Sequence, residues 1–556
     1  MGSRQKARRE KRDMRKQLAD TLLKNGRFLT MEKRGEMAKA VAIAGGRILY
    51  VGTEEEAGKF VDEETEVIDL QGRVAAPGII DCHTHPLASY AYRLAFLSLR
   101  GQNTRSLKRL LDCLREEAAH TPAGEWIVGS GYDESKFEEG ATPLTAEILD
   151  TVSTVHPIYL TRTCGHIAAL NTVAMERSGF LEDARDPEAG GHFFRDAEGR
   201  LTGMISGSVR NRVPVPTVSE EQRCESMIHK VQTEYFSKGI TATGEMGASG
   251  LTSRLLQKMD KEGRLKLRVG YYYSNRRSPQ GQSMSDQLLN LGNTTGFGTE
   301  HVRFMGIKLV TDGSTGGRTA AFSLPYADNP ENYGELYYDQ NVLNEAIYTS
   351  ARAGIQVSIH AIGDRAIESA LQGIEYANAK GVDTRTLRFR LEHLESPTPD
   401  QIRRIKELNL CVGLSSAFIY SLGDSHLSAL GYDRLVDAFP AKTLLANGTV
   451  IGCNSDCPVC DVNPMYGIYS MVTRTTEAGK SFGGRKEAID RWQALEAYTK
   501  NAAYLLCCEE VSGTLTAGKY ADLVVFEQDY LNVPEEELKD IQVYMTVSGG
   551  EIVYRK

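Results

Sequence analysis

Two histidines separated by one residue, His83 and His85, stand at the end of an apolar stretch, GIIDCHTH. Residues i and i+2 of a β-strand point to the same side, so both imidazoles can face one point beyond the strand end. Imidazole is a ligand of zinc and other divalent metals. A pair of this kind is a modest signal alone, because two nearby histidines are often only surface residues. It indicates a metal site if further ligands gather at the same place.

Other candidate ligands also follow apolar stretches. His360 ends VSIH, His393 ends LEH, and Asp456 ends VIGCNSD. A carboxylate at Asp456 can bind a metal and take a proton from water, or it can cap the helix that follows. The chain has eleven histidines, and the placement of four of them at three strand ends favours one shared metal centre.

Lys308 lies inside the apolar stretch GIKLV. A buried ammonium group is costly unless it is paired, so one interpretation is an ion pair with Asp312. The other is a carboxylated lysine: burial lowers the pKa of the amine, the neutral amine adds carbon dioxide, and the carbamate binds metal. Spacing alone does not decide between them.

Three cysteines, Cys453, Cys457 and Cys460, crowd the stretch IGCNSDCPVC and resemble a sulfur-bound metal site. The spacing supplies three ligands, with no fourth nearby and no second CxxC elsewhere in the chain. We therefore expect these cysteines to pack or to line a pocket, and Asp456 to carry the chemistry of this stretch.

Eight stretches with polar ends must position these residues, and the segments between them are mostly of helical length or longer. Such alternation predicts a (β/α)8 TIM-like barrel, in which chemistry occurs at the carboxyl ends of the strands. The stretches are GIIDCHTH, GITATGE, LRVGYYYS, MGIKLVTDGS, IQVSIHAIGD, RFRLEHLE, LCVGLSS and TVIGCNSD.

The barrel is predicted over residues 77–507. Roughly 150 residues separate its first two strands, far more than a barrel repeat needs, so residues 90–225 are interpreted as an inserted substrate-access subdomain. Short alternating stretches with Gly-Gly turns at both ends of the chain predict a small β-sandwich built from residues 18–76 and 508–556.

Composition limits the class of protein. The chain has 556 residues, 41% of them hydrophobic and 25% charged, and a net charge of −8, which argues against a nucleic-acid partner. No apolar run reaches the ~18–20 residues of a membrane span. Residues 1–17 form a basic extension without the apolar core of a secretory signal, expected to be a solvated end rather than a nucleic-acid or membrane-surface arm. The ten cysteines are then expected to be reduced, which indicates a cytoplasmic protein.

Several motifs together resemble the metal-dependent amidohydrolase superfamily, and within it amidohydrolase family 3, which includes N-substituted formamide deformylase-like enzymes. The resemblance covers about residues 18–556. It is carried by LLKNGRFLTM, DCHTHP, GHIAALNTVAM, GIKLVTDGSTGGRTAAF, SIHAIGDRAI, LEHLE, NSDCPVCDVNPMYGIYSMVTR and GTLTAGKYADLVVF. Two departures lie at the predicted barrel mouth, Glu245 in GEMG and the stretch GLSSAF, and they put the best-known substrates of the family in doubt.

The resemblance implies a role for each candidate. His83 and His85 would bind the more buried metal, His360 and His393 the more exposed one. Lys308 would be the carboxylated bridge, and Asp456 both ligand and general base. The number of metal ions, one or two, is left open, and zinc is the metal expected first for a histidine-rich set of ligands.

Substrate contacts fall on family-like segments. Tyr132 and Asp133 lie in SGYDES, and His166 in GHIAALN would hydrogen-bond a carbonyl or oxyanion, or else hold its own turn. Arg318 would meet a substrate carboxylate, or else pair with Asp312 or Glu335.

The implied activity is hydrolysis of an amide, formamide or cyclic-amide C–N bond of a small molecule. A metal-activated hydroxide would attack, with Asp456 as base. Two alternatives stay open: deamination of a small heterocycle, against which Lys308 weighs, and a catalytically inactive metal-binding homologue. Base rates of assembly predict a homodimer.

Overall fold

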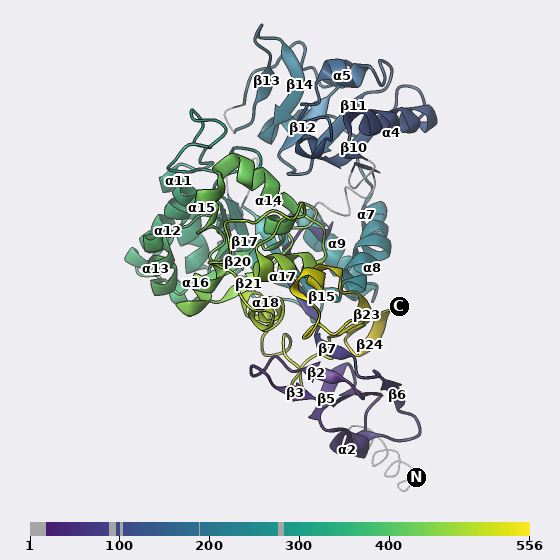
Figure 1. Cartoon of the computed structure of the whole chain (residues 1–556). Coiled ribbons are helices and arrows are strands. Elements are labelled where there is room, and N and C mark those ends of the chain that lie inside the picture. Colours follow the sequence, from purple (N-terminus) through teal and green to yellow (C-terminus); the bar gives the residue numbers. More distant parts are fainter. Residues whose placement is uncertain (1–17, 88–95, 100–103, 188–189, 276–282) are drawn as a thin grey trace.

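The computed structural model describes residues 18–87, 96–99, 104–187, 190–275 and 283–556 (Figure 1). The predicted basic extension, residues 1–17, lies outside the described residues.

Eight parallel strands form one sheet that follows the order of the chain, and all eight predicted stretches contribute a strand to it. The ends of its first and last strands also meet: the backbone N–H of Asp456 donates to the His83 carbonyl at 3.0 Å, and that of His85 to the Cys457 carbonyl at 2.8 Å. The sheet is thus a nearly closed barrel, as predicted. Its strands are β8 (Ile79–Thr84), β15 (Ile240–Ala248), β16 (Arg268–Ser274), β17 (Val302–Val310), β18 (Gln356–Ala361), β19 (Arg390–His393), β20 (Cys411–Leu414) and β21 (Ile451–Cys453).

Helices pack around this sheet because its apolar residues need cover on the outer face. Thr398 and Gln401 form a reciprocal capping box at the start of α13, with Pro399 at its first position. Among the described residues, no helix is both long enough and apolar enough to cross a membrane. From residue 220 onward the described α-helices are α7 (Glu220–Ser226), α8 (Thr233–Ser237), α9 (Gly250–Lys261), α10 (Met284–Leu291), α11 (Gln340–Arg352), α12 (Asp364–Ala379), α13 (Pro399–Glu407), α14 (Ala417–Leu430), α15 (Tyr432–Leu435), α16 (Ala441–Ala446), α17 (Pro464–Thr473), α18 (Arg491–Ala497) and α19 (Lys500–Leu505).

A second sheet of six strands lies entirely between β8 and β15 in the chain. Figure 1 shows it as a blue lobe above the barrel. The helix α4 (Leu107–His120) precedes most of these strands in the chain. The sheet consists of β9 (Leu97–Ser98), β10 (Ile127–Tyr132), β11 (Ile158–Arg162), β12 (Ile167–Leu170), β13 (Phe193–Arg195) and β14 (Leu201–Ser206), accompanied by α5 (Ala146–Asp150) and α6 (Thr172–Arg177).

Two further sheets lie below the barrel in Figure 1. Buried side chains from both sheets share one hydrophobic cluster, which includes Leu23, Phe28, Val41 and Leu523. The first sheet holds β1 (Thr21–Lys24), β4 (Ala40–Ala44), β5 (Arg47–Gly52) and β6 (Glu66–Asp69). The second joins the two ends of the chain through β2 (Arg27–Leu29), β3 (Met37–Ala38), β7 (Val74–Pro77), β22 (Leu523–Phe526), β23 (Val543–Ser548) and β24 (Glu551–Arg555).

Both predicted Gly-Gly turns join antiparallel neighbours in these sheets. Gly45 and Gly46 connect β4 to β5 with φ angles of 57° and 77°, and Gly549 and Gly550 connect β23 to β24 with 57° and 80°. Two successive positive φ angles suit the tight hairpin turn that matches strand twist, and glycine adopts them without strain.

Candidate metal centre

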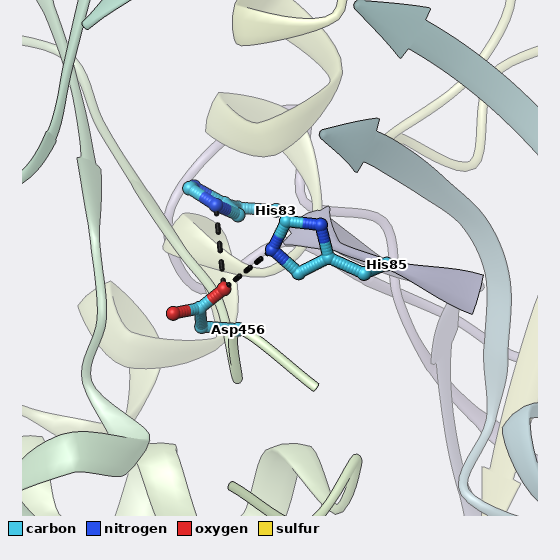
Figure 2. A group of neighbouring side chains, drawn as sticks. All are labelled: His83, His85 and Asp456. Atoms are coloured by element: carbon cyan, nitrogen blue, oxygen red, sulfur yellow. Dashed lines mark hydrogen bonds and ion pairs between the residues drawn. The ribbon is translucent and has the colours of Figure 1, made fainter. Parts of the chain in front are cut away.

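Three predicted ligands, His83, His85 and Asp456, meet at the mouth of the barrel (Figure 2). Asp456 Oδ1 lies 3.0 Å from His85 Nε2 and 3.4 Å from His83 Nε2. One ligand atom from each residue lies within 4.8 Å of the other two. The spacing of the HxH pair and the end of the eighth strand therefore converge as expected.

Local backbone geometry directs these side chains. His83 belongs to β8, and the backbone bonds between the ends of β8 and β21 fix the position of Asp456 beside it. Asp456 has a φ of 53°, in the left-handed region that aspartate tolerates better than most residues. This conformation turns the chain just after β21, and the carboxylate faces the two histidines.

Each of three histidines is held through its Nδ1 atom, and its Nε2 atom is left toward the centre. His83 Nδ1 contacts Glu392 Oε2 at 2.8 Å, His85 Nδ1 contacts the Met246 carbonyl, and His393 Nδ1 lies 2.7 Å from Ser415 Oγ. A carboxylate, carbonyl or hydroxyl partner on the far nitrogen fixes the tautomer and orientation of a metal-binding histidine.

A buried polar network inside the barrel supports His83. Glu392 accepts hydrogen bonds from Ser358 Oγ at 2.9 Å and Arg390 Nη2 at 3.0 Å, and Arg390 Nη1 donates to Tyr272 Oη at 3.0 Å. Arg390 and Glu392 are both fully buried. Sequence reasoning missed them, although a signal existed: RLEH places two opposite charges at i and i+2 within an apolar strand that ends in a ligand.

Lys308 lies against His83, with 3.4 Å between its Nζ and His83 Nε2. Burial lowers the pKa of its amine to about 8. The predicted ion pair between Lys308 and Asp312 is wrong. The Asp312 carboxylate instead accepts hydrogen bonds from the backbone N–H groups of Ala321, Ile362 and Gly363. A buried lysine amine thus adjoins the candidate metal centre.

His360 and His393 lie next to the first three ligands. The ring of His393 is 4.9 Å from that of His83 and 4.4 Å from that of His360. His393 Nε2 is buried without a hydrogen-bond partner in the described structure, whereas His360 Nε2 lies 2.9 Å from the Gly313 carbonyl. The structure thus brings all six predicted ligands into one neighbourhood.

The protonation states suit a divalent cation. Burial, together with neighbouring positive groups, holds the pKa values of His83 and His393 well below the usual range. Burial alone would raise the pKa of Asp456, but His83 and the hydrogen bond from His85 hold it below its usual value. Neutral imidazoles beside a carboxylate, with one buried nitrogen unpartnered, are a donor set that fits zinc or a similar metal.

A cavity joins this centre to the sheet above the barrel. Its lining includes Asp133 and His166 from the region between β8 and β15, and His360, His393 and Asp456 from the barrel. Asp133 also lines a neighbouring cavity of about 290 Å³, which includes the loop after Asp456. Asp133 and His166 thus share a cavity with three of the predicted metal ligands.

The other two predicted substrate contacts lie elsewhere. Tyr132 is 1% exposed and packs in the hydrophobic core around β10. Arg318 forms an ion pair with Asp328 and lines a different cavity, so the alternatives of Asp312 and Glu335 as its partner are wrong. Asp328 follows Arg318 by ten residues in a loop, and no periodic pattern in the sequence identifies it as the partner.

The two places where the sequence departs from the family pattern, Glu245 and the stretch GLSSAF, both contribute side chains to the mouth of the barrel. Glu245 Oε2 accepts the backbone N–H of Leu87 at 2.6 Å, just after the HxH pair. Ser415, from GLSSAF, is the hydroxyl that contacts His393. These residues therefore support the candidate centre.

The cysteines do not form a sulfur site in the described structure. All ten lie in the described residues and none forms a disulfide, and the group of potential ligands found among the described residues is the His83, His85 and Asp456 set. Cys457 and Cys460 line the neighbouring cavity.

Replacing Cys457 and Cys460 together with serine is therefore expected to leave the bound metal unchanged, because no sulfur belongs to the ligand set. Metal analysis by mass spectrometry of the purified variant and wild type checks this. A metal-to-protein ratio that falls in proportion to the lost sulfurs would contradict the assignment.

Known proteins resemble this chain in sequence and in structure over most of its length. The sequence profile of the amidohydrolase family matches residues 66–554. Protein LONG AFTER FAR-RED 3 of Arabidopsis thaliana is 29% identical over 97% of this chain and 92% of its own length. N-substituted formamide deformylase of Arthrobacter pascens is 24% identical over 97% of this chain and 99% of its own. The crystal structure of an uncharacterized metal-dependent hydrolase from Pyrococcus furiosus aligns with a TM-score of 0.71 and 26% identity, covering 92% of this chain and all of that one.

The family profile spans most of the sequence, and the histidine and aspartate motifs among those that carried the resemblance converge at the barrel mouth. This chain belongs to the amidohydrolase family of metal-dependent hydrolases, enzymes that act on carbon–nitrogen bonds.

Proposed function

We propose that this protein hydrolyses the C–N bond of a small amide, such as an N-substituted formamide or a cyclic amide. The observation that carries the proposal is the contact of one carboxylate, Asp456, with both Nε2 atoms of the HxH pair at the mouth of the barrel. The name of the Arthrobacter pascens relative supplies the formamide as the first substrate to test.

His83, His85 and Asp456 would hold a divalent metal, probed first as zinc, with Lys308, His360 and His393 available for the same or a second ion. When bound, the metal polarises the amide carbonyl and makes water acidic enough to attack at neutral pH. Asp456 accepts a proton from that water on its carboxylate and returns it to the leaving nitrogen. A low pKa suits the first step, because it keeps Asp456 ionised at neutral pH.

The region between β8 and β15 would select the substrate. We assign residues 90–225 to an access subdomain and the two terminal sheets to a supporting β-sandwich. His166 faces the cavity that holds His393 and Asp456, where an imidazole N–H can donate to the substrate carbonyl as negative charge develops on its oxygen. Asp133 lines the same cavity and, through its side chain, also accepts a hydrogen bond from Ser135 Oγ at 2.6 Å.

A substrate panel tests the proposed reaction. The zinc-loaded protein is incubated with N-alkylformamides, cyclic amides and amino-substituted heterocycles, and amine, formate and ammonia are assayed separately. Release of amine and formate from an N-alkylformamide, or of the ring-opened amino acid from a cyclic amide, supports the proposal. Ammonia from the heterocycles alone would identify a deaminase, and metal binding without turnover of any compound would identify an inactive homologue.

Lys308 is expected to carry a carbamate, because its buried amine lies beside His83 and has no carboxylate partner within 4.0 Å in the described structure. Incubation with ¹³C-bicarbonate and zinc should give one enriched carbamate signal in the NMR spectrum. The signal should be absent from Lys308→Met. Lys266, on the surface, provides the matched control: Lys266→Met should keep the signal. A wild-type spectrum without the signal would contradict the carbamate.

A further inference from the structure

A third acidic side chain, Glu395, lines the same cavity as Asp133 and Asp456 and stands two residues after the predicted ligand His393. The intervening backbone is unusual: His393 and Leu394 have φ angles of 72° and 45°. Two successive non-glycine residues in the left-handed region are strained, and such strain persists where the surroundings hold a side chain in a particular place. Here it turns the chain after β19, and Glu395 lines the cavity together with His393.

One oxygen of Glu395 is fully engaged. Glu395 Oε2 accepts a hydrogen bond from Thr315 Oγ1 at 2.6 Å and lies 3.1 Å from His426 Nε2. His426 Nδ1 lies 2.8 Å from the Leu422 carbonyl, to which it can only donate. Since Nδ1 bonds the carbonyl, Nε2 is the nitrogen of His426 that contacts Oε2, and the imidazole is held at both of its nitrogens.

The other oxygen of Glu395 is not engaged. Glu395 is 1% exposed, and Oε1 has no hydrogen-bond partner among the described residues. A buried carboxylate oxygen left without a donor is costly, so such an atom in a native site calls for a partner such as an ordered water, an ion or a ligand group. Phe418 and Leu422 also line the cavity and give it apolar surface, and the Phe418 ring stacks on the His393 ring with 5.5 Å between their centroids.

The other charged residues of the cavity offer little free positive charge to bind an anionic group. Arg162 is the one arginine or lysine among the described lining residues. It pairs with Glu134 at 2.8 Å and lies 3.7 Å from Asp133. Its charge is therefore already balanced by carboxylates.

We propose that Glu395 is a specificity residue that receives a protonated amino group or a similar N–H donor on the substrate, connected to the scissile amide by a short apolar segment. This inference rests on the proposed amide hydrolysis for the identity of the other end of the substrate. His426 and Thr315 are positioning residues, because they hold Oε2 and so direct Oε1.

Matched ligands that the protein cannot hydrolyse test the assignment. N-(ω-aminoalkyl)methanesulfonamides with tethers of three to six methylenes are compared with counterparts in which a methyl replaces the ammonium group. Binding to the zinc-loaded protein is measured by calorimetry. At the best tether length the amine is expected to bind about 10- to 100-fold more tightly than its methyl counterpart, as for a hydrogen bond to a charged group.

Variants separate Glu395 from general effects. Glu395→Gln should remove the preference, because an amide held by Thr315 and His426 through its oxygen presents N–H to the cavity. Glu395→Asp, a second variant in case the first does not fold, should keep the preference with a longer optimal tether. Glu487→Gln is the matched control: Glu487 is also buried and accepts from a threonine, Thr443, outside the lining of this cavity, and the preference should persist there.

Equal binding of amine and methyl members at every tether length, or a preference that survives Glu395→Gln, would overturn the assignment. Kinetics with the alkyl and aminoalkyl formamides of the best tether length, N-pentylformamide and N-(4-aminobutyl)formamide where that length is four methylenes, then distinguish the two proposals. If neither is hydrolysed while the calorimetric preference holds, the proposed reaction fails and Glu395 stands. If both are hydrolysed with equal kcat/KM, the reaction stands and Glu395 fails.

Discussion

Asp456→Asn is expected to lower kcat about 10²- to 10⁴-fold, the usual contribution of a general acid–base group. The amide cannot accept a proton from water or return one to the leaving nitrogen. It keeps an oxygen that can face the two histidines, so metal content should fall far less than kcat. Parallel measurements of steady-state kinetics and of metal stoichiometry check this result.

The control for this variant is Asp383→Asn. Asp383 is exposed and pairs with Arg385 at 2.8 Å on the outside of the barrel, so its loss should leave kcat within a factor of about two. Near wild-type turnover of Asp456→Asn with metal bound would remove Asp456 from the reaction. Parallel loss of metal and turnover would restrict it to the role of ligand.

Arg390→Met is expected to destabilise the protein by about 3–5 kcal/mol, the typical cost of breaking a buried ion pair by removing one partner. Arg390 and Glu392 are completely buried, and the substitution leaves the Glu392 carboxylate inside the barrel without its cation. Since Glu392 holds His83, metal affinity should also fall about 10- to 100-fold. Denaturant unfolding and a competitive zinc titration measure the two effects.

Arg403→Met is the matched control for Arg390. Arg403 forms ion pairs with Glu407 and Asp400 on the surface of α13, where such a pair is worth only about 0.5 kcal/mol or less. If Arg390→Met unfolds at the same denaturant concentration as Arg403→Met and wild type, the buried network does not support the barrel. If stability falls while zinc affinity is unchanged, Glu392 holds the fold but does not orient His83.

Much of the barrel could be predicted because its signals are local. Each of its eight strands is a short apolar stretch with a polar end, and chain order alone then gives the sheet order. The same rule placed His83, His85 and Asp456 together, since the carboxyl ends of parallel strands share one edge. It also favoured Asp456 over Cys453, Cys457 and Cys460 in the stretch that contains all four.

Side-chain partners were harder to predict, because they depend on loop paths and rotamers that periodicity does not encode. Asp312 was expected to pair with Lys308, but its carboxylate is used by backbone N–H groups. Arg318 forms its ion pair with Asp328 instead of with Asp312 or Glu335. Ser415 was missed as a support of His393, because a serine at a strand end carries no spacing signal of its own, whereas Arg390 and Glu392 were missed although their opposite charges stand at i and i+2 of one apolar strand.

The central claim is that the strand ends His83, His85 and Asp456 hold a catalytic divalent metal, and anomalous diffraction at the zinc edge tests it most directly. Crystals of the zinc-loaded protein should give an anomalous peak at about 2.0–2.2 Å from the Nε2 atoms of both histidines and an Asp456 oxygen. A second peak beside His360 and His393 would show two ions. A map with no peak at His83, His85 and Asp456, or with its zinc peak at Cys457 and Cys460, would contradict the account.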